Sequence, residues 1–204
     1  MPQILTRAQW LGLVAALTLS AGCQQYTLVP AAKPVVVKDA LTVEPGLAWN
    51  RLALTASLGD GPVEAWTRNG DKLDLLFFLA GIENGKPLFR KAPNATEDPP
   101  AWRAGMAKEE IPSLFESAFT RAMALSVFKY KTIKPHSVAG VPGLRMEFAF
   151  SGGDNVDREG VAVAAERDGK LYLVAFQGPK LLHETQYSAE VERIMATLRL
   201  NQKG

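Results

Sequence analysis

Gly160-VAVAAERDGKLYLVAF-Gln177 is the stretch that decides the fold, because it holds two apolar runs separated by Asp168-Gly169. Asp-Gly tolerates the positive φ angles of a two-residue type I′ turn, so the runs are predicted to pair as an antiparallel hairpin. In this register both faces are apolar, with Val161, Val163, Ala165, Phe176, Val174 and Tyr172 on one and Ala162, Ala164, Ala175, Leu173 and Leu171 on the other. Other elements must therefore cover both faces of the hairpin.

Two segments have the periodicity of helices that supply such a cover. Between Ile111 and Leu125 apolar residues recur at spacings of three and four, which predicts an amphipathic helix. Pro112 stands at its entrance, and Ser113 and Glu116 have the spacing of a capping box. A second helix is expected from about Ser188, with an apolar stripe formed by Val191, Ile194, Met195 and Leu198.

Further strands are predicted on both sides of the first helix. Residues 40–44 and 47–52 read as short strands, and residues 132–138 and 144–150 as longer ones. Residues 63–68 and 71–79 are joined by Asn69-Gly70, which favours a second type I′ hairpin. A two-residue closure at that point would set Trp66 opposite Leu73.

The N-terminus has the layout of a secretory signal. Arg7 supplies a positive side chain, and the almost wholly apolar residues 11–19 follow. This run is half as long as the ~20 residues that a bilayer span needs, so a permanent transmembrane helix is not expected. Ser20-Ala21-Gly22-Cys23 then resembles the lipobox of bacterial lipoproteins, with Ser20 where that family usually has Leu. An ordinary signal peptide with an incidental cysteine, and a buried apolar helix, are the alternatives.

The lipoprotein resemblance implies that cleavage leaves Cys23 as an acylated first residue, with palmitate among its chains. It also implies that Gln24 favours sorting to the outer membrane, on its periplasmic side. Several acyl chains hold a protein stably, because each methylene buried in lipid contributes about 0.8 kcal/mol. The chain is thus divided into a signal peptide at 1–22, a lipidated tether at 23–38 and one domain at 39–204. Fully extended, the tether reaches about 50 Å.

Composition limits the classes of function. With 47% hydrophobic residues in 204, the chain can bury an adequate core. Removal of residues 1–22 takes away Arg7 alone among the charged side chains and lowers the formal net charge from +2 to +1, which gives no reason to expect a nucleic-acid partner. Cys23 is the only cysteine, so disulfides, thiol nucleophiles and cysteine-based metal sites are not expected.

The sequence lacks the usual catalytic motifs. No GxSxG elbow occurs, and His136 and His183 lie far apart without an HExxH pairing. Oxygen ligands of the kind that Ca²⁺ prefers are carried by Asp154, Asn155, Asp157 and Glu159. They lack EF-hand spacing, so a solvated hairpin tip is the simpler interpretation. No cofactor and no metal ion is therefore expected.

A long irregular segment between Ile82 and Glu110 contains four prolines and places aromatic residues beside cations. Loops of this length are uncommon in compact domains and are often functional. The contact with a partner is therefore assigned to Phe89, Arg90, Trp102 and Arg103. In the alternative, Phe89 and Trp102 pin the loop to its own core while the charges are solvated.

The second half of the chain resembles the PsbP-like fold family. The matching features are Gly143-LRME-Phe148, Gly169-KLYLVA-Phe176 and a closing helix that runs into Thr197-Leu198-Arg199. The resemblance implies an α+β fold in which helices flank both faces of an antiparallel sheet, an α/β/α sandwich. The family includes an extrinsic photosystem subunit and non-photosynthetic bacterial lipoproteins. No residue here matches a photosystem-binding or metal site of the family, so none is transferred.

The preferred hypothesis is a lipid-anchored envelope lipoprotein with a non-enzymatic binding or scaffolding domain that faces the periplasm. Its partners would be the membrane, through the anchor, and an envelope protein or cell-surface component. Two alternatives stay open. One is an envelope hydrolase with fold-assembled residues, for which His136, His183 and the carboxylates are candidates. The other is a carrier of a small apolar ligand between sheet and helix, which requires a cavity of order 300 Å³ or more.

Overall fold

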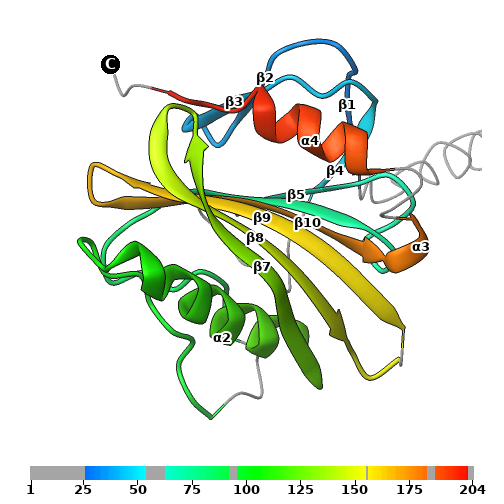
Figure 1. Cartoon of the computed structure of the whole chain (residues 1–204). Coiled ribbons are helices and arrows are strands. Elements are labelled where there is room, and N and C mark those ends of the chain that lie inside the picture. Colours follow the sequence, from blue (N-terminus) through cyan, green and yellow to red (C-terminus); the bar gives the residue numbers. More distant parts are fainter. Residues whose placement is uncertain (1–25, 54–62, 92–95, 155, 183–186, 202–204) are drawn as a thin grey trace, which may run out of the picture.

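A computed structural model describes residues 26–53, 63–91, 96–154, 156–182 and 187–201 of the chain. Within these residues an eight-stranded sheet and a three-stranded sheet form, and every strand pair is antiparallel (Figure 1). The strands are β1 (Tyr26–Val29), β2 (Val35–Val37), β3 (Leu41–Val43), β4 (Trp49–Leu52), β5 (Val63–Thr67), β6 (Leu75–Ile82), β7 (Val127–Val138), β8 (Val141–Ser151), β9 (Asp157–Arg167), β10 (Lys170–Pro179) and β11 (Arg199–Leu200). The helical segments are η1 (Lys108–Glu110), α2 (Ile111–Met123), α3 (Lys180–Leu182) and α4 (Ser188–Ala196).

The predicted hairpin of β9 and β10 is confirmed and lies inside the large sheet. The strand order is β1-β4-β5-β6-β10-β9-β8-β7, and the small sheet has the order β11-β3-β2. Asp168 and Gly169 have φ angles of 54° and 74°, as a type I′ turn requires. The turn sets Val161 opposite Phe176 and Ala162 opposite Ala175, the predicted register.

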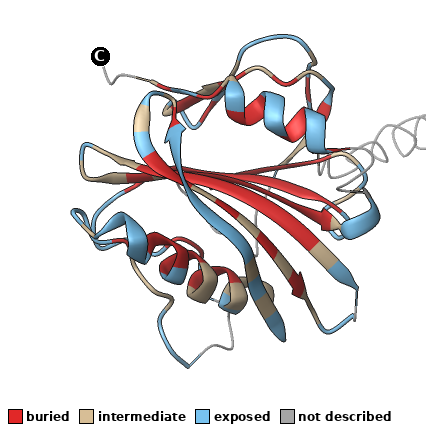
Figure 2. Ribbon diagram, in the orientation of Figure 1, coloured by how far each residue is buried: buried red, intermediate tan, exposed pale blue. Residues whose placement is uncertain are grey.

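Each face of the large sheet has its own hydrophobic core (Figure 2). On one face α2 packs against the sheet through Phe115 and Phe119, whose rings stack at 5.3 Å. On the other face α4 shares the cover with the three-stranded sheet, so Val191 and Ile194 pack beside Val37 and Leu41. The protein is thus mostly antiparallel β-sheet with two short helices rather than the simple helix–sheet–helix sandwich expected from sequence.

The two predicted helices form, but the predicted capping box of the first does not. Glu110 is the N-cap of α2 and its side chain makes no capping hydrogen bond. The 3₁₀ turn η1 leads directly into α2, and the Ile111 amide donates to the Lys108 carbonyl. Ser113 therefore lies inside the first helical turn, where it cannot act as a cap.

The register predicted for the β5–β6 hairpin is wrong. Trp66 lies opposite Leu76 rather than Leu73, because the connection is longer than the two residues Asn69-Gly70. Asp74 is fully buried and organises this connection: it accepts hydrogen bonds from the Thr67 hydroxyl and from the backbone amides of Arg68 (3.0 Å) and Asn69 (3.1 Å). A buried carboxylate needs such donors. Asp74 meets them in the connection, and β6 begins one residue later, at Leu75.

The segment predicted as a tether at 23–38 is, from Tyr26 onward, part of the folded domain. β1 pairs with β4 at the edge of the large sheet, and β2 pairs with β3 in the small sheet. Val29 and Val37 are buried in the core beneath α4. The physical reason for the error is that strands of three and four residues on either side of Pro30 and Pro34 look like a linker until their pairing partners are known.

Glu190 on α4 holds the N-terminal strands to the C-terminal helix. Its buried carboxylate accepts hydrogen bonds from the backbone amides of Gly46 (3.0 Å) and Leu47 (3.1 Å) and from the Trp49 indole (3.1 Å). Hydrogen bonds to a charged group are stronger than those between neutral groups. Glu190 therefore helps to fix the turn between β3 and β4 from more than 140 residues away, together with Thr197 and Arg193, which bind Glu44 in the same turn.

Replacement of Glu190 by alanine is expected to lower the free energy of unfolding by about 3 kcal/mol or more, because three donors lose their buried acceptor. Urea denaturation of wild type and variant measures this loss. Glu192→Ala, on the same helix, removes an exposed carboxylate paired with Arg145 and is the matched control, expected to cost about 1 kcal/mol or less. Equal losses in the two variants would contradict the assigned role.

Tyr187 makes stability depend on pH in the alkaline range. Burial raises the pKa of Tyr187 to about 12, and the nearby Asp74 carboxylate acts in the same direction. The folded state keeps this proton to higher pH than the unfolded chain, where a tyrosine titrates near pH 10. The contribution is therefore complete below about pH 10 and is lost as the pH rises to about 12.

Unfolding free energies of wild type and Tyr187→Phe, measured by urea at a series of alkaline pH values, test this dependence. The variant should lose stability less steeply above pH 10, because phenylalanine has no proton to release. Some slope remains in the variant, since burial also raises the pKa of Tyr130. Identical slopes for the two proteins would show that Tyr187 does not contribute.

Candidate functional site

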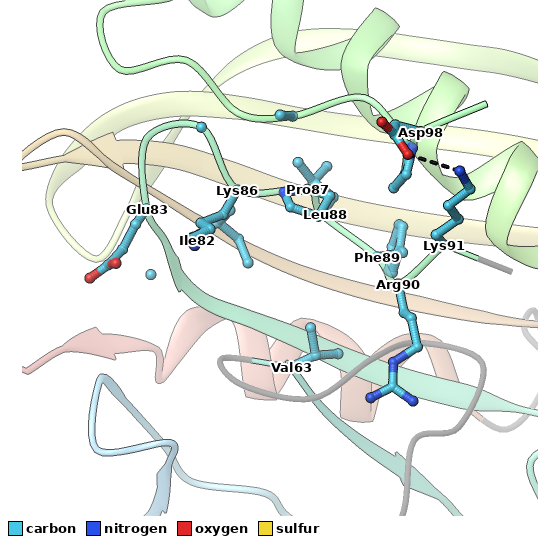
Figure 3. Close-up of a pocket in the computed structure, with 14 residues that line it drawn as sticks. Val63, Ile82, Glu83, Lys86, Pro87, Leu88, Phe89, Arg90, Lys91 and Asp98 are labelled. Atoms are coloured by element: carbon cyan, nitrogen blue, oxygen red, sulfur yellow. Dashed lines mark hydrogen bonds and ion pairs between the residues drawn. The ribbon is translucent and has the colours of Figure 1, made fainter. Parts of the chain in front are cut away.

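A groove of about 980 Å³ opens where β6 ends and the following loop begins (Figure 3). We call it the 82–101 groove, because residues 82–91 and 98–101 form most of its lining. Val63, Ile82, Leu88 and Phe89 lie behind its surface, but they are at most 4% exposed and belong to the core beneath α2. Its accessible apolar lining comes from Pro87, Pro99 and Ala101. Exposed residues, Lys86 and Arg90 among them, form its rim.

Trp102 holds the loop that forms the groove. Its backbone pairs the two arms of the loop, since the Gly85 amide donates to the Trp102 carbonyl (2.8 Å) and the Trp102 amide donates to the Lys86 carbonyl (2.9 Å). The indole is fully buried and donates to the Gly169 carbonyl at 3.0 Å. The loop is thereby fastened to the turn of the β9–β10 hairpin, so the walls of the groove are preorganised.

The structure corrects the predicted partner contact in its aromatic half. Phe89 is 2% exposed and packs against Phe77 and Phe119, and Trp102 is 0% exposed, so neither ring is available to a partner. Arg90 and Arg103 are exposed, as the prediction required. The alternative interpretation, in which the rings pin the loop to its own core, therefore describes Phe89 and Trp102.

Cations outnumber acids around the 82–101 groove. Lys86, Arg90 and Lys91 line it together with Glu83 and Asp98. Asp98 forms an ion pair with Lys91 at 2.9 Å, and Glu83 forms one at 2.9 Å with Lys170 from β10. Both acids thus lie beside cations, and the described lining residues include three cations and two acids. Accessible Pro87, Pro99 and Ala101 beside these charged residues suit a ligand with both apolar and polar parts.

The histidines proposed for a hydrolase do not form a site in the described residues. His136 lies on the exposed edge strand β7, beside a shallow hollow of about 370 Å³ shared with Lys108 and Ser137. Within the part of the chain that the structure describes, His136 makes no hydrogen bond or ion pair with a carboxylate or hydroxyl. His183 lies outside the described residues.

Two acidic side chains of the segment 154–159, Asp154 and Glu159, form ion pairs with neighbouring cations. Arg158 donates to both oxygens of Asp154 (2.9 and 2.6 Å) and lowers the pKa of that carboxyl to about 2. Glu159 pairs with Lys131 at 2.5 Å. Asn155 lies outside the described residues, and among those described no three acidic, histidine or cysteine side chains are grouped as metal ligands.

Two other predictions concern the N-terminal anchor and a ligand cavity between sheet and helix. Cys23 and the signal segment 1–22 lie outside the described residues, the first of which is Tyr26. No helix in the described ranges is long and apolar enough to cross a bilayer. The 82–101 groove exceeds the volume required for a ligand carrier, but it opens at the end of the sheet rather than between sheet and helix.

Sequence reasoning missed Lys86, Asp98 and Val63 as groove residues. Val63 starts a strand nearly twenty residues before the loop, and only sheet pairing brings it to Leu79 and the end of β6. Asn84-Gly85 was the one local signal available, since it is a turn pair directly after an apolar strand. The pairing of Pro87 with Ala101 that shapes the groove has no local signature.

Comparison with known proteins places the fold. The solution structure of cyanobacterial PsbP (CyanoP) from Synechocystis sp. PCC 6803 superimposes with a TM-score of 0.53 at 12% identity, covering 89% of this chain and 96% of that one. PA94 of Pseudomonas aeruginosa, a protein of unknown function, gives 0.46 at 8% identity over 86% and 99% of the two chains. LpqN of Mycobacterium tuberculosis, involved in cell envelope biogenesis, gives 0.33 at 12% over 87% and 91%. No family model and no curated protein matches the sequence. The chain therefore has a PsbP-like fold, and a fold alone carries no activity with it.

Trp102→Ala is expected to cost about 3–5 kcal/mol of unfolding free energy, as a buried aromatic truncation does. The loss should be local to the groove. Hydrogen exchange at the Gly85 amide, which donates to Trp102, should accelerate more than exchange at the Arg68 amide, which donates to Asp74 at the other end of the sheet. If both amides accelerate equally, Trp102 is an ordinary core residue and not the fastener of the loop.

Proposed function

We propose that this protein is a lipid-anchored bacterial envelope lipoprotein whose folded domain faces the periplasm and binds another envelope component in the 82–101 groove. The proposed anchor is acylated Cys23, and outer-membrane sorting is part of the proposal. The role is binding or scaffolding rather than catalysis. The observation that carries it is the groove itself, preorganised by Trp102 and bordered by Lys86 and Arg90.

The start of the fold supports the anchor. β1 begins at Tyr26, three residues after Cys23, and is hydrogen-bonded into the sheet along its whole length. Three residues span at most about 10 Å. An acylated Cys23 would therefore hold the domain directly against the membrane surface, and the groove would meet components of that membrane without crossing the periplasm.

The groove supports binding for a second reason. The two arms of the loop that line it pair at Pro87 and Ala101 and are fastened by Trp102, so they are held in place by the fold rather than by a ligand. A site that needs no ordering on binding loses less conformational entropy when a partner arrives. The carrier hypothesis remains a second candidate in this form, because a cavity of about 980 Å³ accommodates a small amphipathic molecule.

Acylation of Cys23 is tested by metabolic labelling with an alkyne palmitate analogue and mass spectrometry of the N-terminal peptide. We expect label on wild type, an N-terminus at Cys23 and recovery in the outer-membrane fraction. Cys23→Ser should remain unlabelled and unprocessed. An unmodified thiol on a processed wild-type protein would contradict the proposed anchor.

Binding in the groove is tested in cells with a photo-crosslinking amino acid at position 86. We expect adducts with an envelope lipid or protein, at a yield several-fold above that of the same amino acid at position 72. Lys72 is the matched control, since it is exposed in the β5–β6 connection at the opposite end of β6. Equal yields at the two positions would contradict the binding role of the groove.

A further inference from the structure

We propose that the β1 edge of the large sheet lies on the surface of the membrane that holds the acyl chains, with the Leu28 side chain inserted among the lipid headgroups. This inference rests on the proposed Cys23 anchor. It joins three observations: the exposure of Leu28, the position of β1 next to the anchor, and the difference in composition between the two edges of the sheet.

Leu28 forms an exposed apolar surface with its neighbours at the start of the domain. Its side chain is 69% exposed, and Tyr26 and Leu52 are half-buried. Tyr26 pairs with Leu52, and Leu28 lies two residues after Tyr26, so the three side chains share the face of the sheet that carries α2. The next residue, Val29, points to the other face and is buried in the core beneath α4. Because Val29 fixes the direction in which β1 faces, Leu28 is held outward.

The anchor lies close to this surface. Leu28 follows Cys23 by five residues, which span at most about 17 Å, and Tyr26 follows it by three, about 10 Å. Acyl chains on Cys23 would therefore keep both side chains within reach of the headgroup layer. Tyrosine beside an exposed leucine suits that layer, because the tyrosine ring is apolar and its hydroxyl is polar.

The two edges of the large sheet differ in how they are protected from other chains. The opposite edge, β7, has several lysines, a β-bulge at Lys131 and a proline, Pro135. Lysines, bulges and prolines keep an edge strand in water from pairing with another chain. Between Tyr26 and Val29 there is no charged residue, proline or bulge, so β1 has only its short length as protection. A membrane surface against β1 would shield this edge.

The charge around β1 fits an anionic membrane surface. Residues 24–38 contain Lys33 and Lys38 and no acid, and both lysines are exposed. A cation near an anionic bilayer surface favours binding, whereas an acid would oppose it. No side chain of this segment therefore repels the surface on which Leu28 is placed.

Fluorescence quenching by lipid tests the contact in the mature full-length protein, purified from bacterial membranes and reconstituted in nanodiscs. The nanodiscs contain phosphatidylcholine and phosphatidylglycerol, part of it with a nitroxide near the headgroup end of an acyl chain. Acylation blocks the Cys23 thiol, so a bimane fluorophore on Leu28→Cys is the one label per chain. Its quenching should exceed that of bimane on Ile133→Cys several-fold.

Ile133 is the matched control. It is 47% exposed, and it pairs with Met146 of the core beneath α2, so it faces the same side of the sheet as Leu28. It lies on β7, seven strand spacings or about 34 Å from β1. A label that entered lipid through its own apolar character would be quenched at both positions.

A second readout leaves position 28 without a label. Bimane on Asn50→Cys, opposite Leu28 on β4, should be quenched several-fold less when Leu28→Asp is added, because a carboxylate opposes burial in lipid. Ile133→Asp in the same background should leave the quenching unchanged.

Each other outcome overturns a defined part of the inference. Equal quenching at positions 28 and 133, or no effect of Leu28→Asp, overturns the membrane contact and leaves the anchor in place. Disulfide-linked dimers of Leu28→Cys in place of quenching show that a second copy of the chain covers β1, which also overturns the contact. Two labelled thiols per chain show that Cys23 is not acylated, and this result overturns the anchor and the contact with it.

Discussion

The structure depends on one constraint, which is that the β9–β10 hairpin is apolar on both faces and so cannot be left open to water on either. Ala162 and Leu173 point into the core beneath α2, and Val163 and Val174 into the core beneath α4. Burial of this surface is the main favourable term in folding. Each face therefore needs a cover. On one face the cover is α2, from the middle of the chain, and on the other it is α4 with the three-stranded sheet, from the two ends of the chain. Glu190 joins α4 to the turn before β4.

The groove is a consequence of the same constraint. The loop after β6 must cross the end of the sheet to deliver α2 to its face, and Trp102 fastens that loop to the turn of the hairpin at Gly169. The two arms of the loop pair at Pro87 and Ala101 and leave a hollow whose described lining combines Pro87 and Ala101 with charged residues of both signs. β1 begins at this same end of the sheet. The loop that delivers α2 to its face therefore forms the groove near the start of β1.

Local patterns predicted those parts of the fold in which local chemistry decides. The register predicted from Asp168-Gly169 is correct, because a two-residue turn allows only one pairing of the two strands. The same reasoning failed at Asn69-Gly70, where the buried Asp74 carboxylate draws the chain into a longer connection. It failed again for residues 26–38, because the short strands β1 and β2 can be recognised only from their pairing with β4 and β3. Residue type alone also could not show that Phe89 and Trp102 face inward while Arg90 faces out.

Residues 26–38 belong to the folded domain through the pairing of β1 with β4 and of β2 with β3. If Cys23 is acylated as proposed, a flexible tether in their place would let the groove move away from the membrane surface. Hydrogen exchange of the mature protein, followed by mass spectrometry of the peptides covering β1 and β2, tests this pairing directly. Amides of Tyr26–Val29 and Val35–Val37 are expected to exchange orders of magnitude more slowly than those of an unstructured chain. Exchange of both strands at the rate of a free peptide, with β9 and β10 still protected, would contradict it.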